Sequence, residues 1–295
     1  MRTGPAGAEL RRREASDRRP TLQTAGSRSM SSTPDDPFAL AATPAFTPTA
    51  TRSGSVIGLP VELFWLPERR ARRGRPRLDR PPFPPSFAER IIAQEAVWEG
   101  EGLVLTPNRH PFADRQVLLW TKEPRREPDA RLLECGFELA AGCDGALLLN
   151  SIGAAASIPW CHAHLIGLRS SFLAALALEP LDLPIAGPGV EVLRAVAPFP
   201  AALVALRGPI AARAAAAERL IRLRNCAAFN LVDSDATTWL FPRTRETPSP
   251  FFPQALGSSE LFGRWCYDEE EPFARATPAD LQAAIALAGC ARDSV

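Results

Sequence analysis

The stretch Asn150–Leu165, NSIGAAASIPWCHAHL, is the most informative part of this sequence. It follows an apolar run, GALLL at 145–149, which predicts a buried strand. The segment NSIGAAAS at 150–157 predicts a loop of small residues, and IPWCHAHLI at 158–166 predicts a second strand. Small residues let backbone N–H groups approach a ligand closely, as in phosphate-binding loops. The local pattern therefore indicates an anion-binding loop that leads into a strand.

The second strand carries two of the three histidines of the chain, in the tripeptide His162-Ala163-His164. Side chains alternate between the faces of a strand, so both imidazoles are expected on one face with Trp160 beside them. Three interpretations stay open. The pair is structural, it binds a metal with His110 as the one remaining imidazole, or it is catalytic. In the catalytic case one imidazole attacks phosphorus and the other polarises the phosphoryl oxygens.

Helices and strands are interspersed on both sides of this stretch, which predicts an α+β fold. Ser86 followed by Glu89 matches a capping box, Asp129 is a suitable N-cap, and Thr277-Pro278 opens a further helix. The expected helices cover residues 87–97, 130–141, 210–224 and 278–288. The expected strands cover residues 101–106, 116–121, 228–232 and 237–241, and residues 56–66 are apolar enough for a strand or a docking segment.

Composition limits the class of protein. The 295 residues are 46% hydrophobic and 23% charged, which excludes a wholly disordered or collagen-like chain. The net charge of +1 provides no overall field for nucleic acid or anionic lipid, so neither is an expected partner. No apolar run approaches the ~18 residues of a membrane helix, and the N-terminus lacks the apolar core of a secretory signal. Six scattered cysteines without a CxxC pair predict free thiols and a cytoplasmic location.

Three regions are expected along the chain. Residues 1–55 are rich in Ser, Thr, Pro, Ala and Arg and are predicted to be a disordered extension, with Met30 as an alternative start. Residues 56–85 are predicted to be an Arg/Pro-rich linker or docking segment. Its seven arginines between Arg69 and Arg80 are interpreted as a solvated loop, with a phosphate or nucleic-acid patch as the alternative. Residues 86–295 are predicted to form the globular domain.

The motif Asn150-(x)2-Gly153-(x)3-Ser157, continued by IPWCHAHL, resembles the signature of the histidine-triad superfamily. It is most similar to the branch of galactose-1-phosphate uridylyltransferase, diadenosine tetraphosphate phosphorylase and GDP-hexose phosphorylase. The upstream NRHPF at 108–112 is similar to the Asn-x-x-Pro-Phe of that branch's nucleotide pocket. The resemblance is specific over 101–167, weaker over 226–289, and does not cover 1–85.

The resemblance implies antiparallel sheets with packed helices in two half-repeats, at about 86–170 and 205–295. It implies a nucleotidyltransferase or phosphorylase that acts on a nucleotide or nucleotide sugar through a nucleotidyl-histidine intermediate, with phosphate or a sugar phosphate as acceptor. No cofactor and no structural metal are expected, since the family's CxxC zinc half-site is absent here. A monomer or a homodimer is expected.

The resemblance also implies roles for single residues. His162 would be the nucleophile and His164 would hydrogen-bond the α-phosphate oxygens. The other implied site residues are Ser157 and Gly153 in the phosphate loop, Asn150 at ribose or phosphate, Asn108 and Phe112 at base and ribose, and Arg243 at the substrate phosphates.

Two departures from the family pattern keep alternatives open. Trp160 stands at the position of the first triad histidine, and Cys161 replaces the usual small or basic residue. A pseudoenzyme that only binds nucleotide is therefore one alternative. A hydrolase is the other, because water is in excess as acceptor unless the acceptor pocket excludes it.

Overall fold

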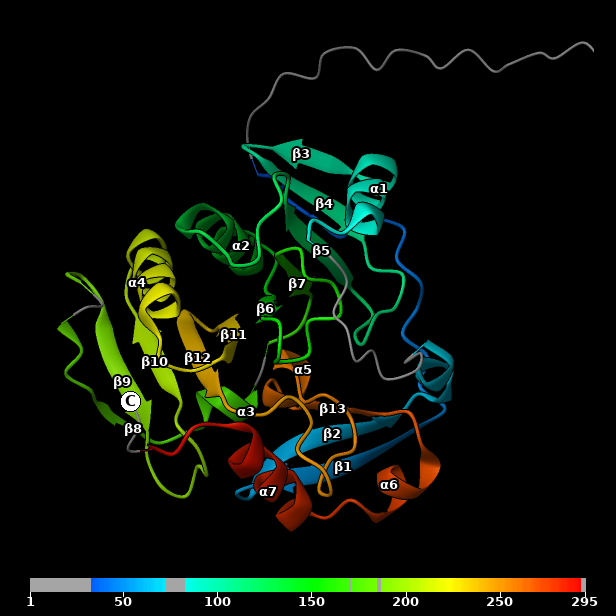
Figure 1. The fold of residues 1–295 in the computed structure, drawn as a ribbon, viewed down its shortest axis with the longest axis vertical. Helices are drawn as coiled ribbons and strands as arrows, with labels where there is room; N and C mark the ends of the chain where they lie inside the picture. The colour runs from blue at the N-terminus through cyan, green and yellow to red at the C-terminus, as the bar shows by residue number, and fades with distance from the viewer. Residues whose placement is uncertain (1–32, 73–82, 170, 185–186, 293–295) are drawn as a thin grey trace, which may run out of the picture. The chain divides into compact units, whose positions relative to one another are not determined.

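The structure is a computed structural model that describes residues 33–72, 83–169, 171–184 and 187–292 (Figure 1). The predicted extension over residues 1–32 and the arginines at 73–80 lie outside these ranges. In the described ranges no helix has both the length and the apolar character needed to cross a bilayer.

One large antiparallel sheet contains ten strands in the described part of the chain, in the order β3-β4-β5-β7-β6-β11-β12-β10-β9-β8. The first half comprises β3 (Trp98–Gly100), β4 (Leu103–Pro107), β5 (Gln116–Thr121), β6 (Ala146–Asn150) and β7 (His162–Ile166). The second half comprises β8 (Leu178–Pro180), β9 (Glu191–Ala195), β10 (Val204–Arg207), β11 (Ala228–Ser234) and β12 (Thr237–Arg243). This arrangement confirms the predicted α+β class.

The two halves repeat one topology. The chain runs β4-β5-α2-β6-β7 in the first half and β9-β10-α4-β11-β12 in the second, with α2 at Ala130–Gly142 and α4 at Ile210–Leu223. β6 and β11 form the central pair, in which Asn150 lies opposite Asn230. Two half-repeats in one chain are therefore confirmed. The second half also includes β8 and β9, because short strands form at residues 178–180 and 191–195, before the expected start near residue 205.

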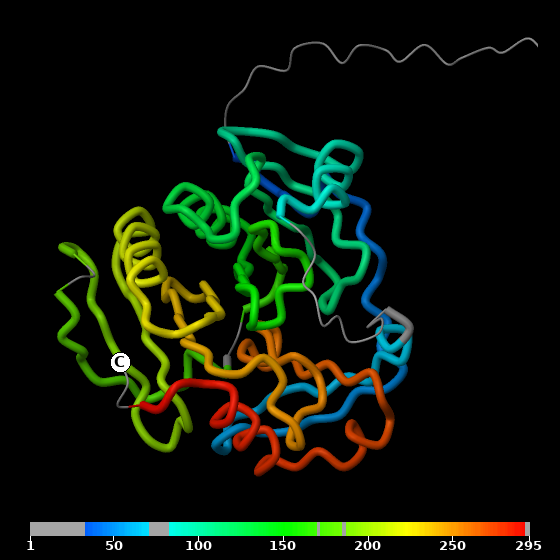
Figure 2. Tube along the Cα trace, in the orientation of Figure 1, coloured from blue at the N-terminus to red at the C-terminus, as the bar shows by residue number. Residues whose placement is uncertain are grey.

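Helices α2 and α4 pack side by side on one face of the large sheet (Figure 2). Asp129 caps α2, as predicted, by accepting a hydrogen bond from the backbone N of Leu132 at 2.9 Å. Both helices bury apolar side chains against the alternate residues of the strands, among them Phe137 from α2 and Ile221 from α4. Alternation thus places one set of strand residues in this core and leaves the other set for the opposite face.

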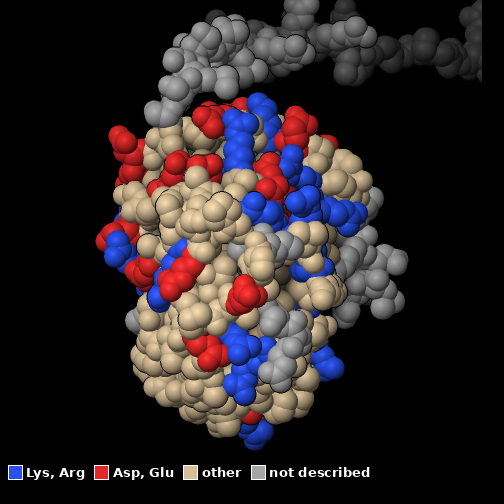
Figure 3. Space-filling view, turned by 90° about the vertical axis from the view of Figure 1, so that its left-hand side faces the viewer, with Lys and Arg blue, Asp and Glu red and all other residues tan. Residues whose placement is uncertain are grey.

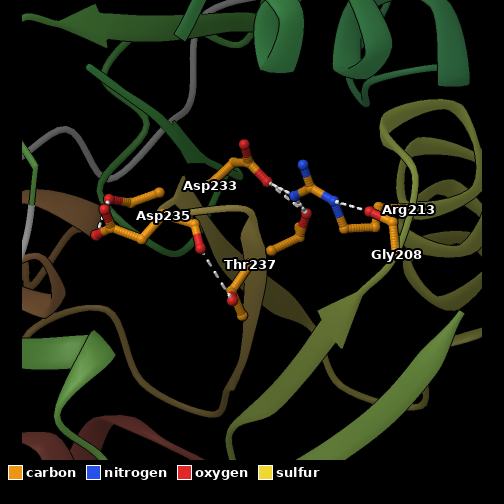
Figure 4. Close-up of polar contacts among 7 residues, drawn as sticks. Gly208, Arg213, Asp233, Asp235 and Thr237 are labelled. Atoms are coloured by element: carbon orange, nitrogen blue, oxygen red, sulfur yellow. Dashed lines mark hydrogen bonds and ion pairs between the residues drawn. The ribbon is translucent and has the colours of Figure 1, made fainter. Parts of the chain in front are cut away.

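A buried ion pair fixes α4 to the β11–β12 hairpin (Figure 4). The Arg213 guanidinium on α4 donates to the Asp233 carboxylate, to Thr238 Oγ1 at 2.7 Å and to Gly208 O at 3.1 Å. It also lies over the ring of Phe137, 5.2 Å from its centroid, and so links α2 to the same cluster. Each buried charge therefore has several partners, as burial requires.

A small sheet lies beyond the other face. It consists of β1 (Ala50–Val56), β2 (Leu59–Trp65) and β13 (Arg264–Tyr267), and β13 pairs with β2 in parallel. Trp239 and Phe241 on β12 share one buried cluster with Trp265 of the small sheet and with Ile285 of α7 (Pro278–Ala288). The small sheet and α7 therefore cover the second half-repeat on this face. The remaining helices are η1 (Pro67–Arg72), α1 (Ser86–Glu95), α3 (Ser171–Ala174), α5 (Ser258–Leu261) and α6 (Glu270–Arg275).

Two local predictions are corrected. The chain is ordered well before residue 55, because Phe46 packs edge-on against Phe64 at 5.0 Å and β1 pairs with β2. Helix α1 has Pro85 at its N-cap and no side-chain cap, so the capping box predicted for Ser86 and Glu89 is wrong. The cap predicted for α7 is confirmed, since Thr277 and Asp280 form a reciprocal capping box.

Candidate active site

A cavity of about 810 Å³ opens on the first half-repeat, on the face of the sheet that carries His162 and His164. Its walls come from β4–β7, from the segment 246–260 and from residues near the small sheet. The predicted residues His162, His164, Ser157, Asn150, Asn108 and Phe112 line it together, whereas Gly153 and Arg243 do not. Segments up to two hundred positions apart in the sequence therefore meet around the histidine pair.

The His162 ring has a defined hydrogen-bond partner. Its Nδ1 lies 2.8 Å from the backbone oxygen of Trp160. A carbonyl oxygen can only accept, so Nδ1 carries the proton and Nε2 keeps a free lone pair. The ring also stacks on Trp120, with centroids 4.4 Å apart and an interplanar angle of 26°. The side chain at the implied nucleophile position is thus held in the tautomer that a nucleophile needs.

The His164 ring lies beside it, as the strand alternation predicted. The two ring centroids are 5.5 Å apart. His164 Nδ1 lies 2.9 Å from Gln116 Nε2. The ring of Phe112 lies on its other side, with centroids 5.4 Å apart. His164 is therefore held between a strand β5 side chain and the loop that precedes β5.

Burial keeps both imidazoles neutral. It lowers the pKa of His162 below the ordinary value of 6.5, against a smaller opposing effect of the Trp160 carbonyl. It lowers the pKa of His164 to about 3, with further contributions from His162 and from the positive charge of Arg69. At pH 7 each neutral ring therefore has one nitrogen that can accept a hydrogen bond and one N–H that can donate one.

The predicted phosphate loop already holds an anionic group. Gly153 and Ala155 adopt positive φ angles of 89° and 74°, so the loop turns sharply there. The backbone N of Ala155 donates to Glu246 Oε1 at 3.2 Å. Glu246 and Ser157 both line the cavity. A carboxylate from the second half of the chain therefore accepts a hydrogen bond from one backbone N–H of this loop.

The side chains of Asn150 and Asn108 both accept hydrogen bonds from backbone N–H groups. Asn150 Oδ1 accepts from Asn230 Nδ2 and from the backbone N of Ser258, both at 2.7 Å. Asn108 Oδ1 accepts from the backbone N of His110 at 3.0 Å. Asn150 thus joins the phosphate loop to the segment that forms the far wall of the cavity.

The role predicted for Arg243 is corrected. Its side chain is fully buried and does not line the cavity. Its guanidinium donates to Asn230 Oδ1, to Leu256 O at 2.5 Å, to Arg245 O at 2.7 Å and to Glu246 O at 3.2 Å. It therefore holds the chain that carries Glu246 and does not reach a substrate phosphate.

Sequence reasoning missed several residues of the cavity. Arg69 lines it, although the arginine run was interpreted as a solvated loop. The other missed lining residues with polar groups are Glu95, Arg109, Glu246, Thr247, Gln254, Ser259, Glu260, Cys266 and Asp268. Except for Arg109, which lies inside the quoted NRHPF motif, nothing local in the sequence marks them, because they come from segments that meet only in the folded chain. No group of three or more His, Cys, Asp or Glu residues suited to a metal ion occurs in the described ranges.

Comparison with known proteins gives a fold but no family by sequence. No family model and no curated protein matches the sequence. Among solved structures, the fold is similar to that of yeast Ap4A phosphorylase Apa2 in complex with Ap4A, with a TM-score of 0.64 and 14% identity over 83% of this chain and 91% of that chain. It is also similar to Apa2 in complex with AMP, with a TM-score of 0.60 and 14% identity over 82% of this chain and 89% of that chain. The chain therefore shares its fold with yeast Ap4A phosphorylase Apa2, in agreement with the antiparallel sheets and packed helices that were expected.

Proposed function

We propose that this protein is a nucleotidyltransferase or phosphorylase in which His162 attacks the α-phosphorus of a nucleotide or nucleotide sugar. The observation that carries the proposal is the Nδ1 contact of His162 with the Trp160 carbonyl. It leaves the Nε2 lone pair on a ring that lines a cavity large enough for a nucleotide. The complexes of Apa2 with Ap4A and with AMP support a nucleotide as the ligand class.

The reaction divides into two displacements. In the first, Nε2 of His162 forms a bond to phosphorus, and the bond from phosphorus to the bridging oxygen breaks, with the electron pair leaving on that oxygen. In the second, an oxygen of phosphate or a sugar phosphate attacks the phosphorus and the P–N bond breaks. The Trp160 carbonyl stabilises the positive charge that the ring acquires in between, because it accepts the Nδ1 proton's hydrogen bond.

The lining of the cavity suits the different parts of a nucleotide substrate. Asn108 and Phe112 belong to the β4–β5 connection, where the resemblance places base and ribose. Arg69 lines the same cavity together with Gln254 and Asp268. A guanidinium matches the geometry of phosphate oxygens, so we assign Arg69 to the leaving or incoming phosphate.

The same geometry bears on the alternatives. Water as acceptor would make the protein a hydrolase, and nucleotide binding without attack would make it a pseudoenzyme. The neutral, oriented ring of His162 favours attack, because a binding protein has no need of a free imidazole lone pair at this position. Trp160 does not block the site, since its indole N donates to the backbone oxygen of Thr121 at 2.8 Å.

We propose a cytoplasmic enzyme that works as a monomer or homodimer without nucleic acid or membrane. Acidic and basic side chains are intermingled on the face drawn in Figure 3, which gives a polyanion no broad basic patch there. One chain supplies both half-repeats of the sheet and all the residues named above around the cavity, which is compatible with either state.

The test is to trap the intermediate. The full chain is incubated with α-³²P-labelled Ap4A, ATP or a nucleotide sugar and quenched in alkali. We expect an acid-labile label on the protein, absent from a folded His162→Ala variant that still binds nucleotide. Nucleotide binding without label would favour the pseudoenzyme, and release of nucleoside monophosphate without added phosphate would favour the hydrolase.

A further inference from the structure

The Gln116 side chain on β5 connects the nucleotide-pocket loop to His164. Gln116 is fully buried. Its Oε1 accepts from the backbone N of Phe112 at 2.8 Å, and its Nε2 lies 2.9 Å from His164 Nδ1. Nothing in the sequence motif identifies this glutamine, and the proposed function does not use it.

The orientation of the Gln116 amide follows from chemistry. A backbone N–H can only donate, so the end of the amide that faces Phe112 is the oxygen. The end that faces His164 is then the NH₂ group, which can only donate. His164 Nδ1 must accept this hydrogen bond, and the proton of the neutral ring must stand on Nε2.

The two histidines are therefore fixed in opposite tautomers. The Trp160 carbonyl places the proton of His162 on Nδ1, and the Gln116 amide places the proton of His164 on Nε2. His162 keeps a lone pair at Nε2, whereas His164 has an N–H donor there. One ring is prepared to attack an electrophilic phosphorus, and the other is prepared to bind a phosphoryl oxygen.

We propose that Gln116 is a positioning residue that holds His164 as an Nε2–H donor toward the phosphoryl oxygens of the transferred group. The role of Gln116 in the reaction rests on the proposed function, whereas the tautomer of His164 can be measured without turnover. Without the amide, His164 is free to carry its proton on Nδ1, and its Nε2 lone pair would then face an anionic oxygen. One net hydrogen bond favours one tautomer on the order of tenfold.

The chain offers an unusually direct test, because it contains three histidines. In the full-length protein labelled with ¹⁵N-histidine, two-bond ¹H–¹⁵N spectra report the tautomer of every ring. His110→Gln, His162→Gln and His164→Gln variants assign the signals. We expect the Nδ1–H form for His162 and the Nε2–H form for His164 at pH 7.5. An Nδ1–H form of His164 in the wild-type protein would overturn the assignment.

Gln116→Glu is the variant that changes chemistry with little change of shape. Its carboxylate still accepts from the Phe112 amide but now also requires a donor from His164 Nδ1. We expect the His164 proton to move to Nδ1 at pH 8, and the rate of protein labelling to fall on the order of 10²–10³-fold. Activity should recover in part at lower pH, where a protonated His164 again has a donor at Nε2.

A merely structural glutamine would not produce this pH dependence. In the His164→Gln background, Gln116→Glu should therefore show no recovery at low pH. An unchanged His164 tautomer in folded Gln116→Glu also contradicts the proposal.

The wild-type spectrum decides the tautomer even where the variant fails to fold. If both histidines have the expected tautomers but no nucleotidyl adduct forms, only the proposed function is refuted. If the adduct forms but His164 has the Nδ1–H form, only the assignment of Gln116 is refuted.

Discussion

At the scale of single residues, the site depends on which nitrogen of each imidazole carries a proton. The HxH pattern predicted two rings on one face of a strand, and the structure places their centroids 5.5 Å apart. The pattern says nothing of the tautomers, which are set by the Trp160 carbonyl and the Gln116 amide. Sequence therefore identified the histidine pair, and the tautomer of each ring follows from contacts formed in the folded chain.

The half-buried imidazole of His164 should make the protein acid-sensitive. In the unfolded chain the ring takes a proton below about pH 6.5, whereas in the folded chain it stays neutral down to about pH 3. The folded state therefore loses stability as pH falls through this range. We expect His164→Gln to lose less stability than the wild type between pH 7 and pH 4.5, by urea denaturation at each pH. Equal losses in the two proteins would contradict this, and His110→Gln controls for loss of an exposed histidine.

Arg69 and its neighbour Arg70 form a matched pair. Arg69 lines the cavity, whereas Arg70 is exposed and does not line it. We expect Arg69→Gln to raise the KM for the phosphate acceptor on the order of 10- to 100-fold, because a charged hydrogen bond contributes about 1.5–3 kcal/mol. Arg70→Gln should leave it unchanged. Steady-state phosphorolysis measures both, and similar constants for the two variants would remove Arg69 from the site.

At the scale of elements, local signals predicted helices and strands well where a cap or an apolar period exists. Asp129 and Thr277 cap their helices as expected. β5 covers Gln116–Thr121, the predicted range. The segments 178–207 and 264–267 form strands without such signals, because short strands gain their stability from the partners they pair with and not from their own sequence.

The ion pair between α4 and β11 gives a prediction at this scale. Arg213 and Asp233 are both buried, so Asp233→Asn leaves the guanidinium without its anion. We expect it to lower the free energy of unfolding by about 3–5 kcal/mol. Asp235→Asn weakens a long, partly exposed contact with Arg169 at 3.8 Å and keeps an oxygen that can accept from Ser234 Oγ, so it should cost under about 1 kcal/mol. Urea denaturation at pH 7.5 compares the two, and equal losses would contradict the structural role.

At the scale of the whole described chain, one topology occurs twice but one half carries the site. His162 and His164 on β7 face a cavity, whereas Trp239 and Phe241 on the related strand β12 lie in a core covered by the small sheet and α7. The small sheet that covers the second half also contributes Cys266 of β13 to the wall of the cavity on the first half.

This asymmetry predicts one nucleotide per chain. The face of β12 that corresponds to the histidine strand is filled with aromatic side chains, so it has no room for a second nucleotide. We expect calorimetric titration with the best-binding nucleotide to give one site per chain, and complete labelling to give one adduct per chain. Two equivalent sites per chain would show that the second half-repeat also binds.

The sequence by itself determined the histidine pair, the loop before it, the capped helices and the strands with a clear apolar period. These depend on side-chain alternation and on hydrogen bonds that span about four residues, so they are encoded locally. Only the tertiary structure decided that Arg69 reaches the cavity, that Arg243 is buried, and that Gln116 contacts His164. Those outcomes depend on which distant segments pack together, and the free energy that selects the packing belongs to the whole core and not to any one stretch of sequence.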